Sequence, residues 1–350
     1  MPQCLKCGAE LPVNEEGMAP VLCDRCAGRA TRRARIGMST STLTQFPATT
    51  ALVAINVAVF VGMVLSGGSP MGFGSAISTQ WGANVGPLTL SGDYWRLVTA
   101  GFVHGSLIHI AFNMWALWSL GQLSERLFGS WITFAVYILT GVGGSLLSIA
   151  WNPMRSEVGA SGAIFGIAGA ILAGIKFGNV SVSSAQRRAI FSSLVFFVGV
   201  NLFIGLAPGI DNMCHLGGFI SGAIFGVPLA TASASGKKSF EWATILIAGL
   251  ALAGIGAQVV QSKAYISQLV VAQEKLEDGD YQGAIVLLER TTTAHPQNAQ
   301  AHTLLGMAYE RSGEREKAIA SYQRALQLEP GFSQLQRHVD QMQNSQSEKK

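Results

Sequence analysis

The chain has 350 residues, of which 49% are hydrophobic and 13% charged, whereas an ordinary soluble domain is roughly 25% charged. This deficit argues against a simple soluble globule, and a formal net charge of +4 is too small to make nucleic acid the leading partner. The 41 glycines lack a three-residue period, which excludes a collagen-like chain. Only 13 of the charged residues lie between Thr50 and Ser262. We therefore predict a membrane domain in the middle and soluble segments at both ends.

Segment 1–35 carries two closely spaced pairs of cysteines, Cys4 with Cys7 and Cys23 with Cys26. Four thiolates on two tight turns close a tetrahedron around one ion, so this spacing predicts a zinc-ribbon-like structural site for Zn²⁺. Two disulfides are the alternative, which a reducing cytoplasm disfavours. The segment also lacks the apolar core of a cleavable signal peptide.

Seven apolar segments follow, and each approaches the roughly 20 residues that a spanning helix needs. They lie near residues 50–65, 104–123, 131–151, 161–177, 189–206, 212–230 and 242–258. Lys and Arg gather in the loops that lie on the same side of the predicted membrane as the N-terminus. Because such loops are usually cytoplasmic, this predicts a cytoplasmic N-terminus. Seven spans would then place everything after residue 262 outside the cytoplasm. The predicted fold class is an all-α polytopic membrane protein.

Polar residues inside these segments are costly in a bilayer and are therefore candidates for function. Hydrolysis of an amide needs a nucleophile, a base and donors for the developing oxyanion. Ser161, His215 and the pair His109 with Asn113 supply these three roles, and His104 lies near the pair. In the predicted topology all five residues lie at a similar shallow depth below the outer surface.

Small residues accompany the serine and the base. A serine at the mouth of a glycine-rich helix is, by itself, most simply ordinary packing. Glycine recurs at every fourth position, however, as Gly162 and Gly166 after Ser161 and as Gly218, Gly222 and Gly226 after His215. Two helices with such faces can approach closely enough for a hydroxyl and an imidazole to form a hydrogen bond.

Five motifs between residues 50 and 230 together carry a family resemblance. They are Trp95-Arg96, His104-x4-His109-x3-Asn113, Glu125-Arg126, Gly159-x-Ser161-Gly162 and His215-x2-Gly218-x3-Gly222. In this combination residues 50–230 resemble a rhomboid intramembrane serine protease. The resemblance implies a six-helix bundle, to which residues 241–262 would add a seventh transmembrane helix.

The resemblance also implies roles for the motif residues. Ser161 would be the nucleophile and His215 the base, and His109, Asn113 and the backbone amide of Ser161 would form the oxyanion hole. No cofactor would serve the chemistry. Supporting residues would be His104 beside the oxyanion hole, Trp95 and Arg96 as anchors of the first outer loop at the lipid interface, and the glycines of the serine motif, Gly159 and Gly162.

Two residues near the expected site need separate weighing. Phe165 stands where some family members carry Tyr, and its ring could still stack on His215 without offering a hydroxyl. Asp211 precedes His215 by four residues, which suggests a catalytic triad. The resemblance implies a dyad, and we expect Asp211 to cap the sixth helix.

Residues 263–343 repeat with a period of 34, seen in Gly279 with Gly313, Ala284 with Ala318, and Pro296 with Pro330. This period is typical of tetratricopeptide repeats, which the segment resembles, with two repeats and a trailing helix. Such repeats bind extended peptides in a concave groove. A spacer or self-association module is an equal alternative.

The sequence as a whole favours a serine endopeptidase that cleaves single-span transmembrane proteins near the outer face of a bacterial inner membrane. Its partners would be these substrates, the lipid bilayer and a protein or peptide bound by the repeats, with no nucleic acid. A catalytically inactive rhomboid-like scaffold is the main alternative. A transporter or metal permease that uses the three histidines as ligands is a second one, although paired inverted repeats and intramembrane carboxylates are missing.

Overall fold

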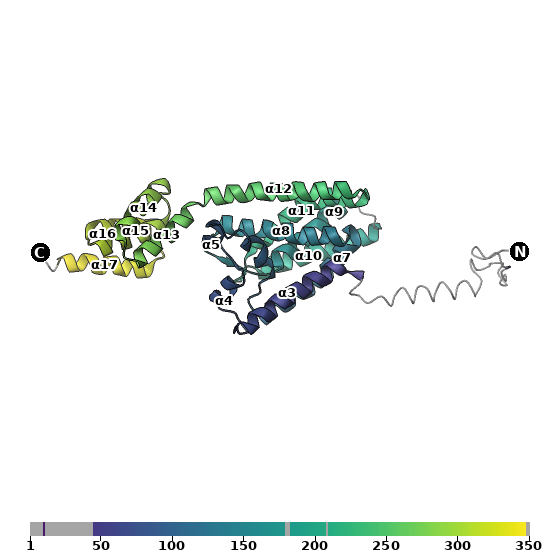
Figure 1. The fold of residues 1–350 in the computed structure, drawn as a ribbon, viewed down its shortest axis with the longest axis horizontal. Coiled ribbons are helices and arrows are strands. Elements are labelled where there is room, and N and C mark those ends of the chain that lie inside the picture. The colour runs from purple at the N-terminus through teal and green to yellow at the C-terminus, as the bar shows by residue number, and fades with distance from the viewer. Residues whose placement is uncertain (1–9, 11–44, 179–182, 208, 348–350) are drawn as a thin grey trace.

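The computed structural model describes residues 10, 45–178, 183–207 and 209–347 of the chain. The four cysteines of the predicted zinc site, Cys4, Cys7, Cys23 and Cys26, lie outside the described residues. Within them, helices form a bundle that is followed by a smaller group of short helices at the C-terminal end (Figure 1). No cluster of three or more His, Cys, Asp or Glu side chains in this described part could hold a metal ion.

The bundle is built from long apolar helices. They are α3 (Pro47–Leu65), α7 (Leu107–Phe128), α8 (Ser130–Trp151), α9 (Ser161–Phe177), α10 (Ser184–Ile204), α11 (Asn212–Ala234) and α12 (Lys238–Ser262). Among the described residues, five of these are long and apolar enough to cross a membrane, namely α3, α8, α10, α11 and α12. α7 meets these criteria for a membrane span only when it is combined with residues 96–102, from which it is bent by 94°. α9 is a shorter apolar helix. All seven apolar segments of the sequence thus contain a helix, but α9 is short for a full span, and α7, although 22 residues long, is not apolar enough by itself.

The connection between α3 and α7 is long and partly ordered by short elements. It contains α4 (Ser75–Gln80), β1 (Asn84–Val85), α5 (Gly86–Leu90), α6 (Arg96–Thr99) and the 3₁₀ turn η1 (Ala100–Phe102). Strand β1 pairs antiparallel with β2 (Ser156–Glu157), which lies between α8 and α9. This two-strand ladder joins the first long loop to the segment that leads to Ser161.

Helix α9 lies at the centre of the bundle, and nearly all of its side chains are buried. Its neighbour α11 packs against it through glycines. A Cβ at Gly218 would lie 1.9 Å from the carbonyl oxygen of Gly162, and one at Gly222 would lie 2.0 Å from that of Gly166. Only glycine permits such an approach, so the four-residue glycine period sets the separation of the two helices.

Local signals at the helix ends explain several boundaries. The Ser106 hydroxyl accepts the backbone N–H of His109 and caps α7, so this helix begins after residue 104. At the other end of the bundle, the buried Glu125 carboxylate accepts the Thr49 N–H at 2.6 Å, at the start of α3. An anion at a helix N-terminus satisfies donors that lack partners inside the helix.

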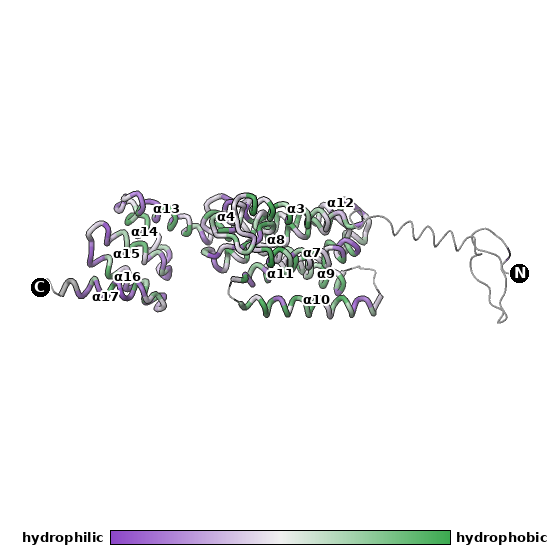
Figure 2. The backbone as a smooth tube through the Cα atoms, turned by 90° about the horizontal axis from the view of Figure 1, so that it is seen from below, coloured by the Kyte–Doolittle hydropathy of each residue, from purple (hydrophilic) through white to green (hydrophobic). Residues whose placement is uncertain are grey.

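Large apolar side chains on α10 and α12 face outward. Phe196 and Phe203 on α10 are 73% and 76% exposed, and Ile247 and Leu250 on α12 are also exposed. Figure 2 shows α10 as a largely hydrophobic helix along one side of the bundle. Exposed apolar surface on long helices with internally bonded backbones is what a lipid bilayer requires of a protein. The chain is therefore a multi-pass integral membrane protein.

The C-terminal helices form antiparallel pairs. They are α13 (Tyr265–Glu277), α14 (Tyr281–Ala294), α15 (Ala299–Ser312), α16 (Arg315–Leu328) and α17 (Ser333–Ser347). Gly306 lies against the Tyr322 ring, and the period-related Ala284 and Ala318 are fully buried. In Figure 1 this group lies beyond the end of α12, at the same end of the bundle as α5. Ile266 of α13 belongs to the same apolar cluster as Leu90 of α5.

Candidate active site

Ser161 and His215 are brought together where α9 and α11 begin. Ser161 is the first residue of α9, and His215 lies in the first turn of α11. The Ser161 Oγ and the His215 Nε2 are 2.8 Å apart, which is hydrogen-bonding distance. His215 is buried and Ser161 is partly exposed. A nucleophile and a base in this geometry can exchange a proton directly.

Helix packing fixes the orientation of the imidazole. The Phe165 ring lies one helical turn after Ser161 and stacks on the His215 ring, with centroids 4.5 Å apart and planes within 3°. The stacking expected from the sequence is therefore present. The Phe197 ring of α10 contacts Phe165 in turn, with centroids 5.9 Å apart.

Asp211 caps α11, as the sequence predicted. Its Oδ1 accepts the backbone N–H groups of Met213 and Cys214, and its Oδ2 accepts the Ser148 hydroxyl. The Nδ1 atom of His215 has no hydrogen-bond partner among the described residues. The geometry is therefore a serine and histidine pair, without a carboxylate on the far side of the imidazole.

Two residues of α7 face the loop that precedes Ser161. Gly159 has a φ of +120°, and a Cβ there would lie 2.8 Å from His109 Nε2 and 3.7 Å from Asn113 Nδ2. The site needs glycine both for this backbone conformation and for this close approach. The Gly105 N–H donates to His109 Nδ1, so a neutral His109 carries its proton on Nε2. Asn113 Nδ2 donates to the His109 carbonyl oxygen within its own helix.

His104 lies in the bend before α7 and is fully buried. Its Nδ1 is 3.2 Å from the Phe102 carbonyl oxygen, and its Nε2 lies 3.5 Å from the Ala160 N–H, at the limit of a hydrogen bond. Its ring packs edge-on against the His109 ring. His104 thus contacts both the backbone before Ser161 and the neighbouring histidine.

Arg96 stabilises the long connection between α3 and α7 from inside. Its guanidinium donates to the Asp93 carboxylate and to the carbonyl oxygens of Thr79 and Ala83. Trp95 is half-exposed beside it, with the Arg96 guanidinium 4.4 Å from the ring centroid. We expected both residues at the lipid interface. Arg96 is instead only 7% exposed, because three acceptors inside the loop take the hydrogen bonds that water would otherwise accept from its guanidinium.

Sequence reasoning missed a polar cluster behind the site. Glu157, Asn84 and Cys214 are buried together, and the carboxylate accepts from both neighbours. Cys214, expected to be only a small buried hydrophobe, donates its Sγ–H to Glu157. The sequence signal that could have revealed the cluster is Glu157 itself, an acidic residue two positions before Gly159 in an apolar region.

Family comparisons match two parts of the chain. A model of the rhomboid domain matches residues 91–232, and a tetratricopeptide repeat model matches residues 271–331. The rhomboid protease AarA of Providencia stuartii is 32% identical over 202 residues, which are 51% of this chain and 71% of that protein. The chain belongs to the rhomboid family.

Other rhomboid relatives share less of their own length. The rhomboid protease GluP of Bacillus subtilis (strain 168) is 32% identical over 286 residues, 79% of this chain and 54% of that protein. The RHOMBOID-like protein 4 of Arabidopsis thaliana is 37% identical over 153 residues, 44% of this chain and 38% of the relative. The chain thus spans about half or less of the length of these two relatives.

Proposed function

We propose that this chain is an intramembrane serine endopeptidase, with Ser161 as nucleophile and His215 as base. The single observation that carries the proposal is the 2.8 Å distance between Ser161 Oγ and His215 Nε2 at the shared end of α9 and α11. Similarity to two proteins named rhomboid proteases supports it. Neither metal nor cofactor takes part in the proposed chemistry.

In the first half-reaction, His215 Nε2 takes the proton of Ser161 Oγ as the oxygen attacks the scissile carbonyl carbon. The C–N bond then breaks, and the imidazolium returns that proton to the leaving amine. The product is an acyl ester on Ser161. In the second half-reaction, water loses a proton to His215 and attacks the ester carbonyl. The bond between that carbon and Ser161 Oγ breaks, the imidazolium returns the proton to Ser161 Oγ, and the acyl product leaves as a carboxylic acid.

Three donors surround the place where the oxyanion would form. The Ser161 N–H lies at the start of α9, where no side chain of the described residues caps the helix. The His109 Nε2–H and the Asn113 amide face Gly159 from α7. Asn113 Nδ2 donates one of its two N–H groups to the His109 carbonyl oxygen, and the second would join them. One such donor typically contributes a factor of about 10² to 10³ in kcat.

The proposed substrates are single-span transmembrane proteins with small or helix-weakening residues near the cut. A peptide bond inside a helix is shielded by its own hydrogen bonds, so the backbone must unwind to reach Ser161. We place the cut near the outer face of a bacterial inner membrane and the N-terminus in the cytoplasm, following the Lys and Arg distribution. The repeats would then be an extracytoplasmic module for recognising a protein or peptide.

The test is cleavage of a single-span reporter by the full chain in proteoliposomes. Wild type should cleave, Ser161→Ala should not, and Ser119→Ala should cleave like wild type. Ser119 is a matched control because it is an exposed serine whose hydroxyl donates to the Trp115 carbonyl oxygen of its own helix. A folded wild type that binds the reporter without cutting it would favour the inactive scaffold.

A further inference from the structure

A buried carboxyl lies four residues before Ser161. Glu157 is the second residue of β2, is 3% exposed and pairs with Asn84 of β1 across the two-strand ladder. No Lys or Arg in the described part of the chain forms an ion pair with it. A buried acid without a cation is costly, and an apolar side chain would fill this place more cheaply. The contacts of Glu157 therefore need an explanation.

Its two oxygens reach two different segments. Oε2 accepts from Asn84 Nδ2 at 2.8 Å, and Oε1 accepts from Cys214 Sγ at 3.3 Å. Asn84 is itself fixed, because the Thr89 hydroxyl donates to its Oδ1 at 2.8 Å. Cys214 immediately precedes His215. One carboxyl thus joins the first outer loop, the strand leading to Ser161 and the first turn of α11.

Cys214 has little room to move on its own. A Cβ at Gly162 would lie 2.6 Å from Cys214 Sγ, and one at Gly144 would lie 2.7 Å from the Cys214 carbonyl oxygen. The cysteine is therefore wedged between α8 and the first turn of α9. A shift of the Glu157 carboxyl would be passed to Cys214, and through the backbone to His215.

The charge state agrees with a buried hydrogen-bonding group. Burial raises the pKa of Glu157 to about 7, the hydrogen bond from Asn84 opposes this rise, and the Asp211 carboxylate adds to it. Asp211 and Cys214, both near the start of α11, are the titratable groups that face Glu157. Below about pH 7 the acid is thus largely uncharged, and glutamine is its closest uncharged substitute.

We propose that Glu157 is a positioning residue that holds the Ser161 loop and the first turn of α11 in register, and thereby sets the distance between Ser161 Oγ and His215 Nε2. This inference rests on the proposed protease function. It assigns no contact between Glu157 and substrate. The binding of a transmembrane helix should therefore be insensitive to Glu157, while the chemical step should depend on it.

The test compares Glu157→Ala, Glu157→Gln and the control Glu241→Gln in the full-length protein. Glu241 is a buried glutamate of α12 whose partner is Lys238 rather than a residue of the site. For each variant, kcat and KM are measured on the single-span reporter, together with the rate of Ser161 labelling by a fluorophosphonate. Glu157→Ala should lower kcat and labelling by about 10-fold to 100-fold, the scale of an ångström misplacement, with KM changed by less than about twofold.

Rescue separates positioning from simple loss of structure. Glu157→Gln should restore kcat to within about threefold of wild type, because the amide keeps an acceptor for Asn84, and Glu241→Gln should behave as wild type. Three results would overturn the inference. They are a wild-type kcat in a folded Glu157→Ala variant, a rise in KM without a change in kcat, and a Glu157→Gln variant that is as impaired as Glu157→Ala. If Glu157→Ala fails to fold, Cys214→Ala decides: unchanged kcat would count against the inference, and a lower kcat at constant KM would support it. A wild type that neither cleaves nor labels would instead contradict the proposed function itself.

Discussion

At the scale of single residues, the polar groups around Ser161 come from segments far apart in the sequence. His109 lies on α7 and His215 on α11, and Gly159 allows the backbone that leads into α9 to pass close to His109. Sequence motifs pointed to these residues because each is an unusual polar group in an apolar segment. Glu157 escaped notice because its partners Asn84 and Cys214 are 73 and 57 residues away and follow no periodic pattern.

The two proposed oxyanion donors on α7, His109 and Asn113, should contribute unequally to kcat. The His109 Nε2 lies 2.8 Å from a Cβ placed at Gly159, whereas Asn113 Nδ2 is farther away, at 3.7 Å, and already donates one of its two N–H groups to its own helix. His109→Ala should therefore lower kcat by about 10² to 10³, the usual loss for one oxyanion donor, and Asn113→Ala by less. Steady-state kinetics on the reporter would check this. An Asn113→Ala loss larger than that of His109→Ala would contradict the assignment.

Glu157 also predicts a pH dependence of stability. It lies in the connection between α8 and α9, and burial raises its pKa to about 7, above the ordinary value of 4.5. A raised carboxyl pKa favours the protonated folded state, so its contribution is fully present at low pH and is lost as pH rises through about 7. The Tm of wild type should fall relative to that of Glu157→Gln between pH 5 and pH 7. A constant difference across that range would count against a buried neutral acid.

At the scale of helices, apolar runs predicted every long helix, because a lipid-facing helix must be apolar over its length. Boundaries were less predictable. The second run suggested a start at residue 104, but the Ser106 cap starts α7 at Leu107 and leaves His104 in the bend, where it contacts Ala160. Such placement depends on a local hydrogen bond that hydropathy does not encode.

The glycine face between α9 and α11 gives a prediction at this scale. Gly218→Ala would place a methyl group 1.9 Å from the Gly162 carbonyl oxygen, so the helices must separate. We expect a loss of about 1–3 kcal/mol in stability, as for overpacked cores, and a marked fall in kcat because Ser161 and His215 move apart. Gly254→Ala on α12 is the control, since no atom in the described part of the chain lies within 4 Å of its added Cβ. Thermal unfolding and reporter kinetics would be measured on both variants, and equal behaviour would refute the role of the glycine face.

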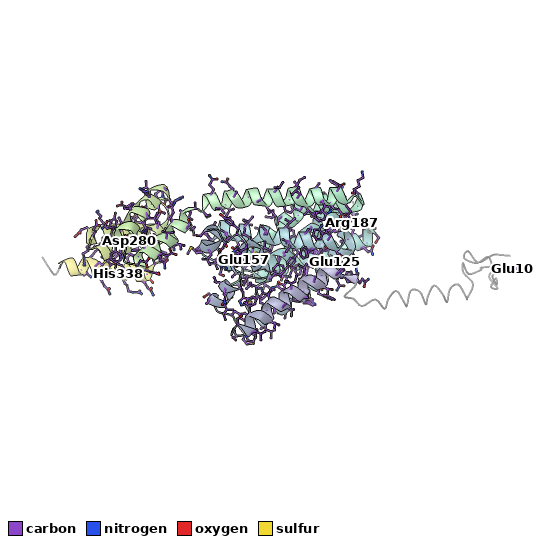
Figure 3. All side chains as sticks on the ribbon, viewed as in Figure 1. Glu10, Glu125, Glu157, Arg187, Asp280 and His338 are labelled. Carbon is purple, nitrogen blue, oxygen red and sulfur yellow. The ribbon has the colours of Figure 1, made fainter. Side chains whose placement is uncertain are left out.

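At the scale of the whole molecule, the repeats lie at the end of the bundle that holds the proposed active site. Glu157 is labelled at this end in Figure 3, whereas Glu125 and Arg187 are labelled at the opposite end. The period of 34 predicted the repeats from sequence, because each unit buries the same small residues. Their packing onto α5 through Ile266 and Leu90 was not predictable, since those positions are ordinary apolar residues in both segments.

This arrangement predicts that the repeats and Ser161 face the same compartment. A cysteine introduced at Asn344 should react with a membrane-impermeant thiol reagent in intact cells, whereas one at Lys237, in the turn between α11 and α12, should react only after lysis. The parent protein without the added cysteine gives the background. Protection of Asn344→Cys together with labelling of Lys237→Cys would reverse the proposed orientation.

Labelling of Ser161 by a fluorophosphonate, located by mass spectrometry, tests the central claim most directly. The probe reacts with an activated serine without needing the natural substrate. We predict that wild type is labelled at Ser161 and that His215→Ala loses labelling although Ser161 is intact, because the base 2.8 Å away is missing. Labelling at another serine, or equal labelling of Ser161 in wild type and His215→Ala, would contradict the account.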